Sequence, residues 1–168
     1  MKIFIGIVIA FFIFLTVPYL FKNLQLKTIT KLDFPKEGSW ANLSAGNIYY
    51  QWHNPTVKAN GETIILVHGF STPSFVWKGL LEDLLSSGYR VLTYDHFGRG
   101  FSERPSVAYT KDFYLRTLNE LLDHHSINDP VHLVGYSMGA PIIGFFSDRY
   151  PEKVRSLSLI APAGFSPT

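Results

Sequence analysis

The sequence predicts an α/β fold in which a mostly parallel β-sheet carries helices on both faces, preceded by one transmembrane helix. From Thr63 onward, short strand-like apolar runs alternate with helical segments. This alternation is typical of right-handed β-α-β crossovers in a parallel sheet. Near the N-terminus, residues 3–21 are apolar apart from Thr16, and such a run is about long enough to cross a bilayer as a helix.

The composition narrows the classes of function. Of the 168 residues, 46% are hydrophobic and 17% are charged, which suits a globular domain with an extra apolar segment. The net charge is only +2 and the basic residues are scattered, so nothing indicates nucleic-acid binding. There are no cysteines, which excludes disulfides and thiolate metal sites. No histidine pair has carboxylate neighbours at ligand spacing, so we expect no metal and no cofactor.

The N-terminal segment predicts an uncleaved single-pass membrane anchor. The end of the apolar run has no small-x-small cleavage site of the kind found in secretory signal peptides, although a cleaved signal remains the alternative. Lysines stand on both sides of the run, so the side of the membrane stays open. We therefore predict an anchor over residues 1–22, a polar linker over 23–44 and a folded core over 45–168.

The strands of the core are predicted from β-favouring and apolar runs. Residues 63–67 (Thr-Ile-Ile-Leu-Val) form an unbroken apolar run, as expected of a strand buried on both faces. Alternation of residue types predicts an earlier strand over 47–52. Similar reasoning predicts the remaining strands, which are residues 90–95, 131–134 and 154–160.

Three helices are predicted between these strands. Residues 74–87 place a stripe of apolar side chains on one helical face, and Gly88 ends the helix. The stripe consists of Val76, Leu80, Leu81, Leu84 and Leu85. A second helix over 112–125 turns Phe113, Leu118, Leu121 and Leu122 inward, and Asn128-Asp129-Pro130 follows it as a break. The third helix covers residues 140–150.

Three segments follow the carboxyl ends of predicted strands, where sites form in parallel sheets. They are His68-Gly69-Phe70, Asp95 to Gly100, and the pentapeptide Gly135-Tyr136-Ser137-Met138-Gly139. A serine between two glycines at a strand-to-helix junction indicates a tight, strained turn that exposes its hydroxyl. The pentapeptide therefore predicts a nucleophilic serine at Ser137.

Together with Tyr94 to Ser102, these motifs resemble the α/β-hydrolase superfamily, in the style of monoacylglycerol-lipase-like and meta-cleavage-product hydrolases. The resemblance covers roughly residues 45–165. It implies that Ser137 is the nucleophile and that the backbone N–H groups of Phe70 and Met138 form the oxyanion hole. It also implies that His68 is structural and that Asp95 and Arg99 shape a turn beside the site.

The resemblance further implies that the catalytic acid and histidine follow the nucleophile in the chain. Both are expected C-terminal to Thr168, so residues 45–168 are expected to be the N-terminal part of the hydrolase core and nearly inactive alone. Other histidines offer no base: His124 and His125 are expected at the opposite end of the sheet, and His132 lies too far back along its strand.

The leading hypothesis is a membrane-anchored serine hydrolase that cleaves a carboxylic ester through an acyl-enzyme on Ser137. An apolar pocket wall of Phe70, Phe75 and Met138 fits a lipid-like ester. Alternatives are cleavage of a C–C bond by the same machinery, perhydrolysis, and a truncated or degenerate membrane protein without activity. Dehalogenases and epoxide hydrolases of this fold use an aspartate nucleophile, which argues against them. The expected partners are a small-molecule ester and the membrane through residues 3–21; protein partners and oligomeric state stay open.

Overall fold

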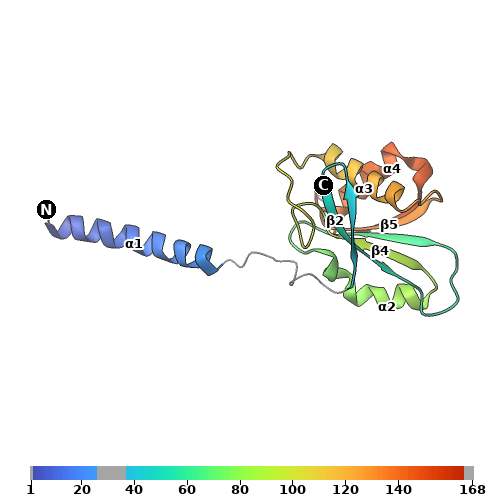
Figure 1. Cartoon of the computed structure of the whole chain (residues 1–168), viewed down its shortest axis with the longest axis horizontal. Coiled ribbons are helices and arrows are strands. Elements are labelled where there is room, and N and C mark those ends of the chain that lie inside the picture. Colours follow the sequence, from blue (N-terminus) through green and yellow to red (C-terminus); the bar gives the residue numbers. More distant parts are fainter. Residues whose placement is uncertain (1, 26–36, 165–168) are drawn as a thin grey trace. The chain divides into compact units, whose positions relative to one another are not determined.

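The computed structural model of the protein describes residues 2–25 and 37–164 (Figure 1). The chain divides into two compact units, residues 1–35 and residues 36–168. Much of the predicted linker lies outside the described residues.

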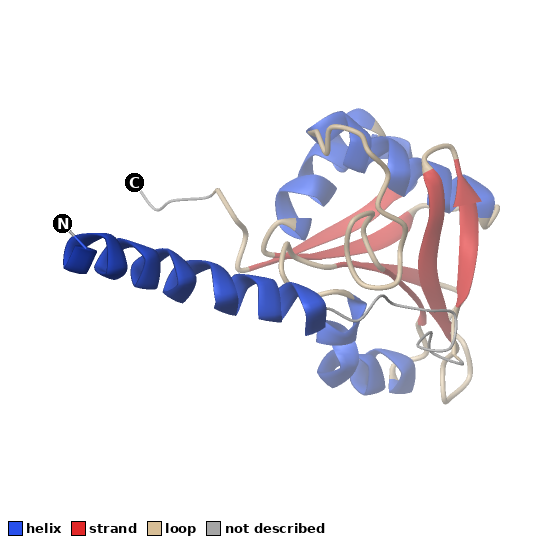
Figure 2. Ribbon diagram, turned by 60° about the vertical axis from the view of Figure 1, so that its left-hand side comes forward, coloured by secondary structure: helices blue, strands red, loops and turns tan. Residues whose placement is uncertain are grey.

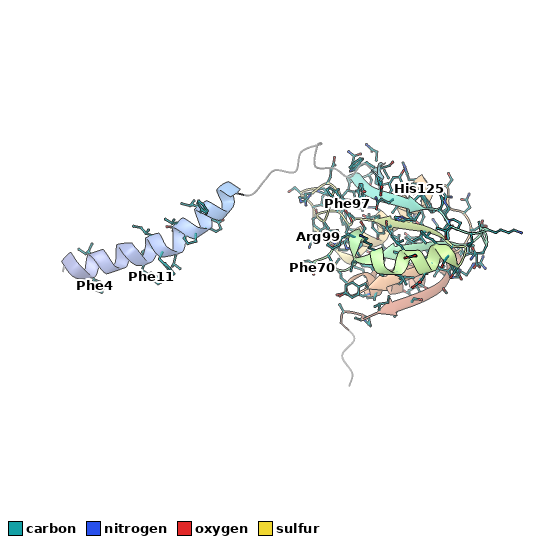
Figure 3. The ribbon with its side chains drawn as sticks, turned by 90° about the horizontal axis from the view of Figure 1, so that it is seen from below. Phe4, Phe11, Phe70, Phe97, Arg99 and His125 are labelled. Carbon is teal, nitrogen blue, oxygen red and sulfur yellow. The ribbon has the colours of Figure 1, made fainter. Side chains whose placement is uncertain are left out.

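The first unit contains helix α1 (Lys2–Gln25), and the window Phe4–Phe21 has a mean hydropathy of 2.5. By length and composition this helix could cross a membrane, either as an anchor or as a signal sequence. Its described side chains, including Phe4 and Phe11 in Figure 3, are exposed. Pro18 removes one backbone donor inside the helix, which membrane helices tolerate better than an exposed soluble helix does.

The second unit is built on a six-stranded sheet with the order β1-β2-β4-β3-β5-β6. Its strands are β1 (Ser39–Leu43), β2 (Gly46–His53), β3 (Thr63–Val67), β4 (Arg90–Tyr94), β5 (Val131–Tyr136) and β6 (Val154–Ile160). Strands β4, β3, β5 and β6 are mutually parallel, and β1 and β2 are antiparallel additions at one edge. The mostly parallel sheet that the sequence predicts is confirmed (Figure 2).

Helices cover both faces of this sheet (Figures 1 and 2). On one face, α3 (Lys111–His124) and α4 (Gly139–Arg149) pack over a core that includes Leu92, Leu118 and Phe146. On the other, the short 3-10 helix η2 (Ser74–Trp77) and α2 (Lys78–Ser86) cover Ile64, Leu66 and Val91. Another short 3-10 helix, η3 (Pro151–Lys153), leads from α4 into β6. The four residues of α3 predicted to turn inward are all buried.

Two expectations for individual elements differ from the structure. The sequence predicts residues 39–43 as part of the linker, but they form β1, which pairs with β2 in an antiparallel hairpin. Only Ala41 and Leu43 of this strand are buried. A strand with so few buried positions needs no long apolar run, and the sequence therefore gives little signal for it. The predicted helix over 74–87 begins as η2, and this turn buries Trp77 and exposes Val76.

Strand β6 forms one edge of the sheet and is exposed along most of its length. Its apolar residues Leu157, Leu159 and Ile160 are 38%, 44% and 41% exposed. No described strand pairs with its outer edge. An unpaired apolar edge strand favours pairing with a further strand.

Candidate active site

Ser137 stands at the junction between β5 and α4, in a conformation that few non-glycine residues adopt. Its φ angle is +51°, in the left-handed region where a side chain is strained. The glycines on either side allow this turn. A Cβ on Gly135 would lie 2.6 Å from the carbonyl oxygen of Gly139, and a Cβ on Gly139 would clash with the carbonyl oxygen of Val67. The tight packing of strand and helix therefore requires glycine at both positions.

Main-chain hydrogen bonds hold the strained turn in place. The N–H of Ser137 donates to the carbonyl of Ile160 over 2.9 Å, at the end of β6. The carbonyl of Ser137 accepts from the N–H groups of Ala140 and Ala163 over 3.2 and 3.1 Å. In contrast, the hydroxyl of Ser137 has no hydrogen-bond partner among the described residues. The backbone is fixed while the half-buried hydroxyl stays available for chemistry.

The loop after β3 lies directly against Ser137. A Cβ on Gly69 would lie 3.1 Å from the Cβ of Ser137, so only glycine fits there comfortably. The next residue, Phe70, has a main-chain N–H without an acceptor in the described part of the chain, and the same holds for Met138. The structure thus brings the three predicted site residues together at the carboxyl end of the sheet. The unused N–H of Met138 follows Ser137 directly, and that of Phe70 follows the glycine that packs against Ser137.

A reciprocal pair of buried histidines supports this loop from below. The main-chain N–H of His96 donates to Nε2 of His68 over 2.9 Å, and Nε2 of His96 lies 3.0 Å from the carbonyl oxygen of His68. Nδ1 of His68 lies 2.7 Å from the carbonyl oxygen of Gly69. Both ring nitrogens of His68 are therefore occupied, and this histidine is unsuited to act as a general base. The sequence motif predicts a structural role for His68, but nothing in the sequence indicates its pairing with His96.

Burial keeps this pair neutral. Desolvation lowers the pKa of His68, and desolvation together with the neighbouring His68 lowers the pKa of His96 well below its usual value. The arrangement needs neutral rings, because Nε2 of His68 must accept a hydrogen bond. Protonating either histidine would place a positive charge in a site that is nearly free of water.

The pair predicts that stability falls as the pH falls below about 6.5. Unfolded histidines bind protons near pH 6.5, whereas the folded pair does so only at lower pH, so the unfolded state gains protons first. The free energy of unfolding should decrease by up to about 1.4 kcal/mol per pH unit for each histidine in that window. Urea unfolding between pH 7.5 and 5.5 measures this dependence of the free energy of unfolding on pH. The His96→Gln variant should show a smaller slope of that free energy against pH. An equal slope in both proteins would contradict the assignment.

The turn after β4 is organised by the buried carboxylate of Asp95. Its two oxygens accept the main-chain N–H groups of Ser74 over 2.8 Å and Phe101 over 3.0 Å. A Cβ on Gly100 would clash with the same carboxylate. Asp95 therefore ties η2 to the glycine-rich turn, and neither oxygen is directed to Ser137. This is the fold-shaping role that the resemblance implies for Asp95.

A cleft of about 380 Å³ opens beside the serine turn. It is lined by Phe70, Gly98, Arg99, Tyr109, Tyr114 and Met138. Figure 3 shows Phe70 and Arg99 at one end of the folded unit and His125 at the other. The side chain of Phe70 is 62% exposed, so this side of the cleft is open to solvent. Phe70, Tyr109 and Tyr114 give the cleft an aromatic lining. Tyr109 and Tyr114 carried no motif signal, because single aromatic residues near a helix start are common.

The remaining histidines lie away from the serine. His125 accepts a hydrogen bond from the indole of Trp52 over 3.3 Å and packs against Tyr50. Burial, with His124 and Arg90 nearby, lowers the pKa of His125 to about 4. His132 lies 2.7 Å from the hydroxyl of Ser156. Among the described residues, no cluster of three metal-ligating side chains occurs.

The chain belongs to the α/β-hydrolase fold family, whose model matches residues 62–168. Over 103 residues it is 37% identical to a Synechocystis sp. protein inferred to be a non-heme chloroperoxidase, covering 61% of this chain and 37% of that protein. Lipase 3 of Moraxella sp. is 32% identical over 106 residues, covering 62% and 33%. Haloalkane dehalogenase 2 of Mycobacterium tuberculosis is 31% identical over 127 residues, covering 75% and 42%.

A solved structure supports the same fold. The crystal structure of a probable hydrolytic enzyme from Pseudomonas aeruginosa PAO1 matches with a TM-score of 0.71 and 28% identity, covering 79% of this chain and 43% of that one. The chain thus spans less than half the length of each of these four proteins. The relatives carry the names of several different reactions, so the family alone does not fix the substrate.

Proposed function

We propose that the protein is a serine hydrolase that cleaves a carboxylic ester through an acyl-enzyme on Ser137. The observation that carries this proposal is the strained serine turn together with two N–H groups that have no acceptor, those of Phe70 and Met138. Acyl transfer develops negative charge on the former carbonyl oxygen. Two fixed donors at that oxygen suit this chemistry, and each is worth about 3 kcal/mol of transition-state stabilisation.

In the proposed reaction, the hydroxyl oxygen of Ser137 attacks the ester carbonyl carbon and its proton passes to a base. The tetrahedral oxyanion accepts hydrogen bonds from the N–H groups of Phe70 and Met138. Collapse of this intermediate breaks the bond between the former carbonyl carbon and the alcohol oxygen. The alcohol leaves with the proton that the base took from Ser137. Water then hydrolyses the acyl-enzyme and restores Ser137. The positive end of α4, which begins at Gly139, adds to the field at the oxyanion.

The base belongs to another part of the full-length protein in this proposal. None of the histidines between residues 37 and 164 hydrogen-bonds to Ser137. A serine hydroxyl without a base is a weak nucleophile near neutral pH. Chain order in the family supports an acid and then a histidine after Ser137, and the short span of this chain against its relatives leaves room for both.

Two alternatives use the same site differently. Cleavage of a C–C bond needs the same nucleophile and donors, and differs only in the leaving group. A non-catalytic role would leave Ser137 without a function, although its turn is strained and its hydroxyl is unpaired. Dehalogenation is less favoured as a reaction. Dehalogenases of this fold use an aspartate nucleophile, whereas this chain has Ser137 at that position.

Reaction with a fluorophosphonate probe tests the proposal. The hydroxyl oxygen of an activated serine displaces fluoride and forms a bond to phosphorus, so labelling requires the base as well as the nucleophile. The full-length gene product should be labelled, and mass spectrometry should place the label on the peptide containing Ser137. Labelling at another serine, or no labelling of folded protein, would contradict the proposal.

We also propose that residues 3–21 anchor the protein in a membrane. The exposed apolar surface of α1 and its length support this. The full-length protein should stay in the membrane fraction after alkaline carbonate washing, with Met1 or Lys2 as its N-terminus. Deleting residues 1–22 should move it to the soluble fraction. A mature N-terminus near residue 22 would show that the segment is a cleaved signal instead.

A further inference from the structure

Arg99 is held rigidly beside the serine turn. Its Nε donates to the carbonyl oxygen of Phe70 over 2.6 Å, and Nη1 donates to the carbonyl oxygen of Gly98 over 2.9 Å. The guanidinium also lies 4.2 Å from the centre of the Phe70 ring (Figure 3). Three contacts therefore fix the position of a long side chain that would otherwise lose much rotamer freedom on binding a ligand.

This arginine has no anionic partner. No carboxylate forms an ion pair with its guanidinium among the described residues. A guanidinium has five N–H donors, and these two hydrogen bonds leave the others without an acceptor in the described part of the chain. The carboxylate of Asp95, in the same turn, already accepts two main-chain N–H groups. The charge of Arg99 is thus positioned but not neutralised by a salt bridge.

Arg99 also belongs to the cleft that adjoins the proposed oxyanion donors. It lines the same 380 Å³ space as Phe70 and Met138, and it is the one charged residue among the six that line it. Tyr114 lines the cleft as well, and its hydroxyl makes no hydrogen bond within the described chain. A substrate that places its ester at Ser137 therefore extends into a cleft with one fixed cation and one free hydroxyl.

We propose that this cleft selects esters that carry a carboxylate or phosphate group near the scissile bond, and that Arg99 binds this anion. The planar fork of a guanidinium matches both groups with paired hydrogen bonds. This inference rests on the proposed function, because it names the substrate class of the same site. The anion lies on either the acyl side or the alcohol side of the ester, and the two are distinguished by experiment.

Two matched pairs of substrates, assayed on the full-length protein, test the inference. On the acyl side, mono-p-nitrophenyl glutarate is compared with the neutral p-nitrophenyl 5-methylhexanoate. On the alcohol side, 1-butyrylglycerol 3-phosphate is compared with 1-butyrylglycerol. The anionic member of at least one pair should have a kcat/KM about tenfold higher or more. The pair that shows the preference identifies the side on which the anion binds.

Variants of Arg99 separate charge recognition from support of the loop. Arg99→Gln should abolish the anionic preference, and any general loss of rate should appear equally with the neutral esters. Arg99→Lys should keep part of the preference. Arg104→Gln is the matched control, because Arg104 lies in the same turn but does not line the cleft. It removes the same charge and should leave the preference unchanged.

Inorganic phosphate provides a measurement that does not depend on the variants folding. It should slow fluorophosphonate labelling of the wild-type protein competitively, at constant ionic strength. The inference is overturned if neither pair shows a preference, if Arg104→Gln removes it as fully as Arg99→Gln, or if phosphate gives no protection. Failure of the proposed function looks different: the wild type then hydrolyses none of the four esters, or Ser137→Ala hydrolyses them equally well.

Discussion

Replacing Ser137 with alanine in the full-length protein is expected to lower kcat for short-chain p-nitrophenyl esters by about 10⁴-fold or more. The variant keeps the proposed oxyanion donors of Phe70 and Met138, so weak residual catalysis should remain. The fold should be unchanged, because the Ser137 hydroxyl makes no hydrogen bond with the described residues. The Ser137→Ala variant should also not be labelled at residue 137 by the fluorophosphonate probe.

The control for this variant is Ser87→Ala. Ser87 follows α2, and its exposed hydroxyl donates to the carbonyl oxygen of Asp83 over 2.8 Å. This variant should hydrolyse the esters at the wild-type rate. Equal hydrolysis by the Ser137→Ala variant and the wild type would show that another group performs the reaction, and the proposed mechanism would be wrong.

Replacing Gly139 with alanine is expected to be the most damaging conservative change in the folded core. The added Cβ would clash with the main-chain carbonyl of Val67 and lie 2.8 Å from that of His68. Backbone atoms of β3 cannot rotate away as a side chain can, so the helix must shift from the strand. We expect a loss of about 3 kcal/mol or more in the free energy of unfolding, together with loss of labelling at Ser137.

The same substitution five residues later provides a control of opposite sign. Gly144 lies in the same helix, and a Cβ added there would meet no atom within 4 Å. Alanine favours the helix over glycine by about 1 kcal/mol, so Gly144→Ala should stabilise the protein slightly. Urea unfolding of both variants decides the matter. Similar effects at the two positions would mean that crowding at the serine turn is not what limits residue 139.

The sequence predicts the sheet and the position of the serine turn well, because both depend on local patterns. The apolar run over 63–67 and the segment over 154–160 match β3 and β6 to the residue. Strand β1 was missed because its partner β2, rather than its own composition, makes residues 39–43 extended. Short edge strands depend on such pairing more than on propensity.

The motifs locate the site, but its supporting contacts depend on tertiary structure. The positions of Ser137, Phe70 and Met138 follow from the motifs and from the rule that sites form at the carboxyl ends of parallel strands. The reciprocal bonds of His68 and His96 join two loops that are 28 residues apart. Likewise, the stacking of Arg99 on Phe70 requires the crossover to bring β3 and β4 together. Such contacts leave no periodic signal in the chain.

The hydrogen bond from Ser137 to Ile160 sets an order of events during biosynthesis. The strained turn has a φ of +51° and is tied to β6, which is translated more than fifteen residues later. While the ribosome is still adding that strand, the serine lacks one of the contacts that hold its conformation. Domains fold as their segments emerge, so Ser137, the proposed nucleophile, makes this hydrogen bond only after β6 has left the exit tunnel and joined β5.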